Sequence, residues 1–285
     1  KVVLLLTLPF AGAEVVLQAH GWAVYYAPVV IWALGLSMIF AVVVLKLRAA
    51  TPVGALAGAV VAACMIFSTT TLIPGAAILY APWRSALIPL LAVVVLTFAA
   101  TRLGRKRKEI LGVAERRHGR TEAQVAANLG VAAIAFSGFV QSSLFEGGRF
   151  HAPLILLAVP LAALAEAGSD TVSSEIGQAL GGQPRMITTL HPVAPGTDGG
   201  ISLIGTLAGV VAAAIIAAAG AWALSGGLKI FWVSAAGGVF GLFFDSLLGA
   251  TLERRGWLNN DAVNFLSTTS AALFALGVLV IWTGF

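Results

Sequence analysis

Long apolar segments separated by short polar loops constrain this chain more than any other feature of its sequence. A membrane-spanning helix needs about 20 mostly apolar residues, and stretches near that length recur along the whole chain. Charged residues make up only 10% of the 285 residues, whereas a soluble domain typically has about 25%. The sequence therefore predicts an all-α protein, a polytopic transmembrane helix bundle.

The apolar segments predict about nine helices, of which the sixth is short enough that it could continue into the polar stretch behind it. The predicted helices cover residues 2–19, 22–45, 52–73, 85–101, 124–145, 152–167, 201–224, 230–250 and 264–284. If the N-terminus is cytoplasmic, 14 of the 17 lysines and arginines lie on the cytoplasmic side. Positive charge is enriched in cytoplasmic loops, so we expect the N-terminus inside and the C-terminus outside.

The charge and cysteine content exclude some classes of function. A net charge of +5 would suggest a nucleic-acid partner in a soluble protein, but here membrane orientation explains where the charge lies, so no nucleic acid is expected. Cys64 is the single cysteine, which rules out an internal disulfide and a thiolate metal site. We expect one integrated membrane domain, with N-terminal helices in residues 1–100 and a catalytic part with cytoplasmic polar motifs in residues 101–285.

The polar stretch EAGSDTVSSEIG begins at Glu166 and gathers acids and hydroxyls that are rare elsewhere. Asp170 lies four residues after Glu166, whereas Glu175 lies about 140° from Asp170 around a regular helix. Either Gly168 breaks the helix, or the acids bind through different groups. Carboxylates and hydroxyls together suit a hard cation such as Mg²⁺. The alternative is that Ser169 and Asp170 cap a helix.

The segment PGTDGGISLIGT, residues 195–206, is a glycine-rich turn that opens the seventh predicted helix. A helix N-terminus offers unpaired N–H groups and a positive dipole end, which suit an anion. Gly199 and Gly200 would let a phosphate approach the backbone closely. The turn has no GxxxxGK[ST] pattern, so it is not a P-loop.

The loop 101–120 is strongly basic, and Arg102 to Lys108 is typical of a topology determinant beside anionic headgroups. Its end differs, because Arg120, Gln124 and Asn128 recur every four residues and share one helix face. Asn128 enters the apolar layer, where its amide serves either helix packing or ligand binding. An arginine of this loop could hold a phosphate.

Gly237, Gly241, Asp245 and Gly249 recur every four residues in the eighth predicted helix. The glycines predict a close-packed face, and the same face directs Asp245 into the bundle. A carboxylate there is costly without a cation or a partner, which favours a functional role.

The following loop, ERRGWLNNDAVN, brings further polar groups to the start of the last predicted helix. Asp261 could be an ordinary helix N-cap. Asn264 enters the apolar layer, where an amide needs a partner, so a structural role alone explains it less well.

Taken together, SDTVSSEIG, PRMITTLHPVAPGTDGGISLIGT, FDSLLGATLERR and NNDAVNF occur in an order that resembles one known family. This is the integral-membrane family that includes plant and cyanobacterial phytyl-phosphate kinase and that was long known only as a domain of unknown function. The resemblance covers about residues 100–285, and GRTEAQVAANLG resembles an earlier block of the family. Polyprenol, dolichol and phytol kinases are more distantly similar. One departure is Val172, where the family often has an aromatic residue.

The resemblance implies an enzyme that transfers a phosphoryl group from a nucleoside triphosphate to a prenyl monophosphate lipid such as phytyl or geranylgeranyl phosphate. CTP is the implied donor and Mg²⁺ the implied cofactor. The resemblance assigns catalysis and metal binding to Asp170, Glu175 and Asp245. The implied phosphate- and nucleotide-binding residues are Arg185, Thr188, Thr197, Asp198, Gly199, Gly200 and Ser202. The implied substrate-binding residues are Arg120, Gln124, Asn128, Asp261 and Asn264.

Two other functions compete with this interpretation. A transporter or flippase for an anionic lipid or metabolite also uses intramembrane carboxylates, although no inverted repeat is visible and the polar motifs are predicted on one face. A CTP-dependent lipid cytidylyltransferase would bind the same substrates but release pyrophosphate. In each case we expect the protein in the cytoplasmic membrane of a prokaryote, with the polar site facing the cytoplasm.

Overall fold

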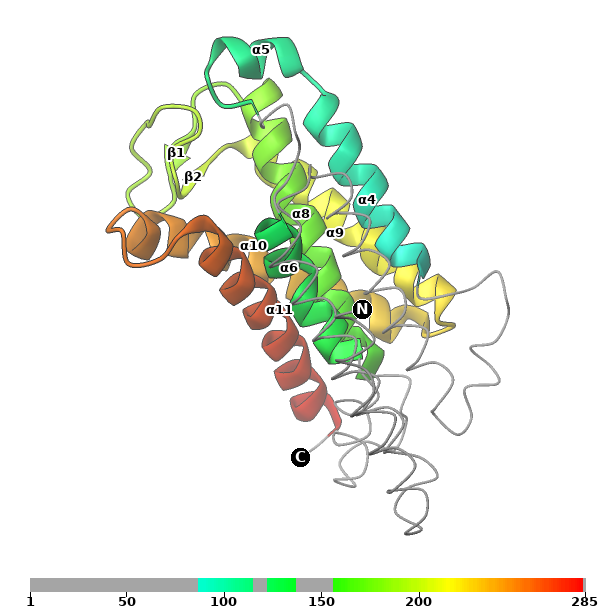
Figure 1. Cartoon of the computed structure of the whole chain (residues 1–285). Helices are drawn as coiled ribbons and strands as arrows, with labels where there is room; N and C mark the ends of the chain where they lie inside the picture. Colours follow the sequence, from blue (N-terminus) through cyan, green and yellow to red (C-terminus); the bar gives the residue numbers. More distant parts are fainter. Residues whose placement is uncertain (1–86, 115–121, 137–155, 284–285) are drawn as a thin grey trace, which may run out of the picture.

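The computed structural model describes residues 87–114, 122–136 and 156–283, and these form a helical bundle with one small hairpin (Figure 1). The predicted helices 2–19, 22–45 and 52–73 lie outside the described residues, as does Arg120. The helices are α4 (Leu87–Arg102), α5 (Arg105–Ile110), α6 (Glu122–Phe136), α8 (Ala158–Leu180), α9 (Leu203–Ala223), α10 (Gly227–Leu248) and α11 (Asn260–Thr283). A π-helical turn, η3 (Gly249–Glu253), extends α10, and the strands β1 (Arg185–Met186) and β2 (Gly200–Ile201) pair antiparallel.

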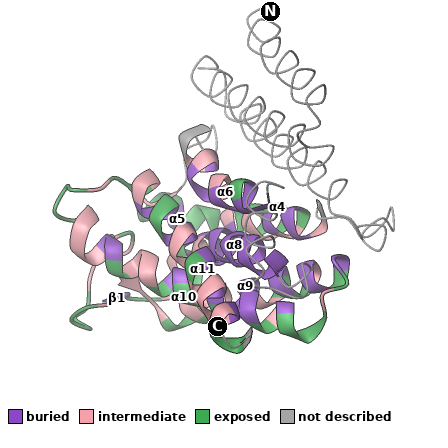
Figure 2. Ribbon diagram, turned by 90° about the horizontal axis from the view of Figure 1, so that it is seen from below, coloured by how far each residue is buried: buried purple, intermediate pink, exposed green. Residues whose placement is uncertain are grey.

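Helix α8 is the centre of the bundle. Helices α4, α6, α9, α10 and α11 all pack against it, and Figure 2 shows it buried while the outer helices expose their outward faces. Its core-facing part is rich in alanine, the strongest helix former, and Ala162, Ala163 and Ala165 are fully buried. Pro160 lies in the first turn, where a proline is tolerated. The small side chains allow the neighbouring helices to approach closely.

Glycines on α9 and α10 supply the other half of this close packing. A Cβ on Gly237 would lie 2.7 Å from the Cβ of Ala162, and one on Gly238 would lie 2.7 Å from the Cβ of Ala165. On α9, a Cβ on Gly205 would lie 2.6 Å from the carbonyl oxygen of Ser173. The close-packed glycine face predicted on the eighth helix is confirmed.

The outer helices are apolar enough for a membrane. Three helical segments have the length and hydropathy to cross one: Leu203–Ala223, Gly227–Glu253 and Asn260–Trp282. Ile88–Arg102 and Gln124–Phe136 are shorter apolar helices. Helix α8 is comparable in length but carries Glu166, Asp170 and Glu175. The described helices therefore form the core of an integral membrane protein, with the acids on its innermost helix.

The predicted helices and the observed ones differ mainly where polar sequence continues a helix. Residues 158–167 of the predicted segment 152–167 belong to α8, which extends through the polar stretch to Leu180, as the short length of the segment had suggested. Helix α5 and the β1–β2 pair were not predicted, and both belong to polar connections. These connections, together with the turn between α10 and α11, lie at one end of the bundle (Figure 1).

The predicted orientation can be tested at this end of the bundle. In a Cys64→Ser background, we expect Lys106→Cys and Leu190→Cys, both at exposed positions, to react with a membrane-impermeant thiol reagent only from the cytoplasm. Ser225→Cys, in the turn at the opposite end of α9, is the matched control and should react only from outside. Labelling of position 106 or 190 from outside would overturn the predicted orientation.

Candidate functional site

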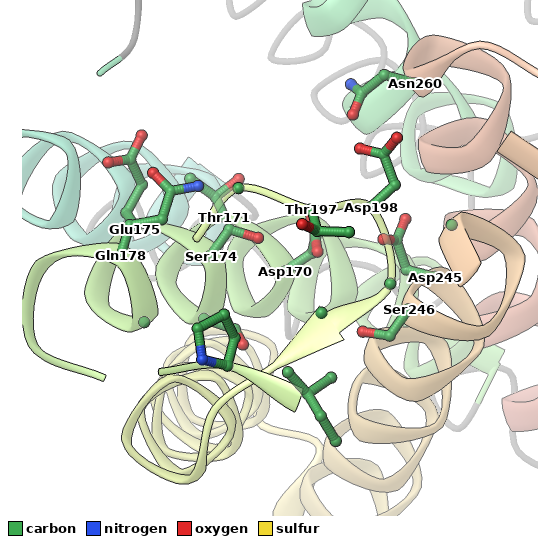
Figure 3. Close-up of a pocket in the computed structure, with 18 of the residues that line it drawn as sticks. Asp170, Thr171, Ser174, Glu175, Gln178, Thr197, Asp198, Asp245, Ser246 and Asn260 are labelled. Atoms are coloured by element: carbon green, nitrogen blue, oxygen red, sulfur yellow. The ribbon is translucent and has the colours of Figure 1, made fainter. Parts of the chain in front are cut away.

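A cavity of about 410 Å³ opens at the polar end of the bundle, where α8 ends and α9 begins. Helix α8, the glycine turn before α9, the end of α10 and the start of α11 each supply part of its lining (Figure 3). Its polar lining side chains are Gln124, Asn128, Asp170, Thr171, Ser173, Ser174, Glu175, Gln178, Thr197, Asp198, Ser202, Asp245, Ser246, Glu253, Asn260 and Asn264. The cavity therefore joins motifs that lie far apart in the sequence.

The charge of the cavity is negative. Five described lining residues carry carboxylates, and no described lining residue is a lysine, arginine or histidine; the five are Asp170, Glu175, Asp198, Asp245 and Glu253. An anionic ligand such as a phosphate would be repelled by this lining unless a cation came with it. The cavity thus suits a cation, or a cation together with the anion that it neutralises.

Asp170 and Glu175 leave α8 in different directions, because the helix is unbroken from Ala158 to Leu180. Gly168 does not interrupt it; its missing side chain makes room for Ile216 of α9. Ser169 lies in the middle of the helix and donates to the carbonyl of Glu166 at 3.0 Å, so the capping alternative is wrong. Of the two possibilities that the sequence left open, a break at Gly168 is therefore wrong, and binding through different groups stays a prediction.

Asp245 faces the cavity from α10, and its Oδ2 atom is buried without a hydrogen-bond partner among the described residues. Figure 3 shows Asp245 beside Asp198 and Asn260, whereas Glu175 lies at the other side of the cavity. The charges of Asp170 and Glu253 both act on Asp245. A buried carboxylate oxygen without a partner is costly, so a cation at this position would relieve it.

Glu166 lies beneath the cavity, is 1% exposed, and also has an unpartnered oxygen, Oε2, among the described residues. Ser267 of α11 is fully buried beside Glu166, and its hydroxyl donates to the carbonyl of Asn264 at 3.0 Å. Gly241 leaves the space that the side chain of Glu166 occupies. Polar groups of three helices therefore meet at the base of the cavity.

These residues fit Mg²⁺ only if a ligand completes its coordination. Among the described residues, no group of three histidine, cysteine or acidic side chains forms a ready-made metal site. Proteins usually hold Mg²⁺ through one or two carboxylates together with substrate phosphates and waters. Asp170 and Asp245 can supply the carboxylates, and a phosphate in the cavity can supply the rest.

Gly199 and Gly200 of the glycine turn line the cavity, and the turn also packs against η3. Gly199 has a φ of +73°, and a Cβ there would lie 2.5 Å from the Cα of Ala250 in η3. The N–H of Gly200 donates to the carbonyl of Thr197 at 2.9 Å within the turn. The glycines thus allow the turn to lie against η3. In the first turn of α9, the N–H groups of Gly205 and Thr206 donate to Ser202. Those of Leu203 and Ile204 have no acceptor within the helix, so they remain for an anion.

Ser202 sits where the turn becomes helix α9. Its hydroxyl accepts from the N–H of Gly205 at 3.1 Å, so it is the N-cap of the helix. It also lines the cavity, as do Thr197 and Asp198. The predicted opening of the seventh helix by this turn therefore matches the observed start of α9 at Leu203.

Replacing Gly199 by alanine tests the packing role of the turn. We expect Gly199→Ala to lose roughly 3 kcal/mol of stability, since the backbone of η3 must move. Gly182→Ala is the control, because Gly182 also has a positive φ, +71°, but an added Cβ there would meet nothing within 4 Å. This variant should therefore lose only the roughly 1 kcal/mol of stability that a left-handed backbone costs a residue with a side chain. Thermal unfolding in detergent measures both. Equal losses would show that Gly199 has no packing role beyond its backbone angle.

The structure brings some implied ligand residues to the cavity and leaves others away from it. Gln124, Asn128 and Asn264 line it, and the amide of Asn128 donates to the carbonyl of Gln124 at 2.8 Å. Arg185 is exposed outside the lining and donates to the carbonyl of Leu190 at 2.9 Å. Thr188 is also exposed and outside the lining.

The start of α11 corrects one expectation for the last loop. Asn259, rather than Asp261, is the N-cap of α11, because its Oδ1 accepts from the N–H of Ala262 at 2.9 Å. Asp261 is partly exposed and lies outside the cavity lining. Its place in the first helical turn still suits the positive end of the helix dipole.

Sequence reasoning missed Glu253 and Lys108. Glu253 reaches the cavity through the π-helical turn η3, and such turns are frequent at functional sites, but no residue pattern in LERR announces one. Lys108 is 1% exposed although it belongs to the basic run interpreted as a topology determinant. One signal in the sequence points to a buried base such as Lys108. Acids are rare in this chain, so Glu175 needs a positively charged partner.

Comparison with known sequences assigns the family. The profile of the family described as integral membrane protein DUF92 matches residues 35–272. The chain belongs to the DUF92 family. This confirms the resemblance indicated by the polar motifs, since they fall within the matched region. The cavity is therefore built from the part of the chain that defines a DUF92 protein.

Relatives of this DUF92 protein occur in archaea, cyanobacteria and plants. The uncharacterized membrane protein MJ0933 of Methanocaldococcus jannaschii is 45% identical over 123 residues, 43% of this chain and 50% of the relative. The uncharacterized membrane protein sll0875 of Synechocystis is 36% identical over 205 residues, 69% of this chain and 74% of the relative. Protein VTE6, chloroplastic, of Arabidopsis thaliana is 32% identical over 190 residues, 65% of this chain and 56% of the relative. No solved structure matches significantly.

Proposed function

We propose that this DUF92 protein is a Mg²⁺-dependent kinase that transfers a phosphoryl group from a nucleoside triphosphate, with CTP as donor, to a prenyl monophosphate. The acceptor would be a lipid such as phytyl or geranylgeranyl phosphate, and the product its diphosphate. The observation that carries the proposal is the acidic cavity at the N-terminus of α9, at the polar end of an apolar bundle. The resemblance of its motifs to phytyl-phosphate kinase supports it, as does the similarity to the chloroplast protein.

Phosphoryl transfer requires alignment and neutralisation of charge more than it requires covalent chemistry from the protein. Both proposed substrates are anions, and the described cavity lining has no basic side chain. Asp170 and Asp245 would hold Mg²⁺, which would supply the neutralising charge for the phosphates. The first N–H groups of α9 would hold a phosphate from the other side.

The acceptor needs little activation. A phosphate monoester already carries an anionic oxygen, so that oxygen can attack the terminal phosphorus of the triphosphate without a strong base. The bond to the nucleoside diphosphate breaks as the new P–O–P bond forms. The amides of Gln124, Asn128 and Asn264 can orient the acceptor phosphate, because each lines the cavity.

The surroundings of the cavity suit a lipid chain. Leu203, Ile204 and Leu207, in the first turns of α9, expose 76%, 45% and 56% of their surface. Ser202, directly before them, lines the cavity. A phosphate bound in the cavity could therefore leave its prenyl chain along this apolar face, within the hydrocarbon layer.

Product analysis tests the proposal. Purified protein is incubated with Mg²⁺, each of the four common nucleoside triphosphates, and phytyl or geranylgeranyl phosphate, and the lipids are identified by mass spectrometry. We expect prenyl diphosphate and nucleoside diphosphate in equal amounts, and none when Mg²⁺ is chelated. A nucleotide attached to the lipid with release of pyrophosphate would instead identify a cytidylyltransferase. Unchanged lipid with every donor would refute the kinase.

A further inference from the structure

Lys108 is a deeply buried charged group outside the cavity lining. Its side chain is 1% exposed, and its Nζ donates to the carbonyls of Ala100 at 3.1 Å and Thr101 at 2.7 Å, at the end of α4. The same Nζ forms a close ion pair with Glu175 of α8, whose side chain is 13% exposed. Thr101 also donates to Glu175, at 3.4 Å. One lysine thus connects α4, α5 and α8.

The backbone of Lys108 carries this connection to the wall of the cavity. Its carbonyl accepts from the N–H groups of Val113 at 3.0 Å and Ala114 at 3.2 Å, which folds the chain back after α5. Val113 lines the cavity. It also lies against the glycine turn, since a Cβ on Gly196 would lie 2.6 Å from its Cγ1. Glu175, Lys108, Val113 and Gly196 therefore form a continuous chain of contacts.

We infer that Glu175 and Lys108 are a positioning pair that holds the segment 108–113 against the glycine turn and so forms one wall of the substrate cavity. This assigns Glu175 to the wall instead of the metal, and its effect on turnover rests on the proposed kinase function. Breaking one partner of a buried pair leaves the other charge uncompensated, which is strongly destabilising locally. The segment would then leave the turn, while Asp170 and Asp245 would stay in place.

An engineered cross-link measures the position of this wall without any assay of activity. In the Cys64→Ser background, Val113→Cys and Gly196→Cys are combined, because the Cβ positions at 113 and 196 are 3.5 Å apart. Disulfides need Cβ atoms about 3.5–4.5 Å apart. The left-handed backbone at Gly196 strains any side chain, but this strain is the same in every variant compared. The rate of disulfide formation under mild oxidation is then followed on gels.

We expect the cross-link to form about tenfold more slowly or worse when Glu175→Gln or Lys108→Met is added, because the uncompensated charge draws the segment out toward water. Glu109→Gln is the matched control on the same helix. It breaks the exposed pair of Arg105 and Glu109, and exposed pairs contribute little, so the rate should not change. Glu175→Gln keeps the size of the side chain and is the milder change, so it decides the result if Lys108→Met does not fold. An unchanged rate in Glu175→Gln, or no cross-link in the parent, would overturn the inference.

Kinetics separate the two roles of Glu175. A positioning role predicts that Glu175→Gln raises KM for both substrates by about tenfold, leaves kcat within a factor of about three, and does not move the Mg²⁺ concentration for half-maximal rate. A metal-binding role predicts a shift in that Mg²⁺ concentration with an unchanged cross-linking rate, and would overturn the inference. If the parent shows no kinase activity, the kinase function fails, whereas the cross-linking rates still decide the role of the pair.

Discussion

Asp245→Asn is expected to lower turnover by a factor of about 10² to 10³ or more while leaving the protein folded and at least as stable as the parent. The carboxylate of Asp245 has a buried oxygen with no hydrogen-bond partner in the described part of the chain. An amide of the same size removes the charge that a bound cation needs. It also removes a buried charge that the folded protein must otherwise tolerate. Lower turnover together with unchanged or higher stability is what we expect when a residue supports function at a cost in stability.

Turnover and thermal unfolding of the same preparations check this prediction. Asp261→Asn is the matched control, because Asp261 is partly exposed and lies outside the cavity lining; it should retain parental turnover. Near-parental turnover in Asp245→Asn would remove Asp245 from the proposed metal site. A large loss of stability would instead show that the charge of Asp245 supports the fold.

Asp170→Asn is expected to lower turnover to a similar extent, and the double variant Asp170→Asn/Asp245→Asn to lose little more than either single variant. Asp170 lies on α8 and Asp245 on α10, and their negative charges are close enough to repel each other. If both hold one cation, removing the first already abolishes its function, so the effects cannot add.

The binding of Mg²⁺ with nucleotide provides a second measurement for this pair. A ligand that binds the folded state raises the temperature of unfolding by an amount that grows with its affinity and its concentration. Both single variants should lose the shift produced by Mg²⁺ with nucleotide. Ser246→Ala, a neutral change in the same lining, should keep most of it. Fully additive losses of activity in the double variant would contradict a shared cation.

The hydrophobic pattern predicted the described helices well, because the requirement to satisfy backbone groups in lipid leaves few alternatives to helix. The predicted segments 201–224 and 264–284 differ from α9 and α11 by only a few residues. The apolar pattern of the sixth helix stops at residue 167, and only its short length indicated that the helix could continue. Helix α8 continues through polar residues because one face of that part lines a cavity, and hydropathy averages over all faces.

The acids of the site were visible in the sequence, but their partners were not. The helical angle between Asp170 and Glu175 correctly indicated that their side chains leave an unbroken α8 in different directions. It could not show that Glu175 pairs with Lys108, since the two residues are 67 positions apart. A basic run looks the same whether its lysines face headgroups or one of them turns inward. The burial of Lys108 depends on α5, a six-residue helix that no periodic pattern reveals.

The glycine positions predicted where another group approaches the backbone closely, but not which group it is. Gly199 was predicted to lie beside a phosphate; it lines the cavity, and it also packs against the backbone of Ala250. Both neighbours demand a residue without a side chain, so the sequence pattern is the same. Glu253 was missed for a related reason: it reaches the cavity only because η3 adds a π-helical turn after α10. Such a turn changes the direction of every later side chain.

The most direct test of the kinase function follows which phosphorus of the nucleotide enters the lipid. Purified protein, Mg²⁺ and geranylgeranyl phosphate are incubated with the nucleoside triphosphate labelled either at its terminal or at its innermost phosphorus, and the lipid fraction is counted. For a kinase we expect only the terminal label to enter the lipid, in the parent and in Asp261→Asn but not in Asp245→Asn. Innermost label in the lipid, or terminal label that enters equally well in Asp245→Asn, would contradict it.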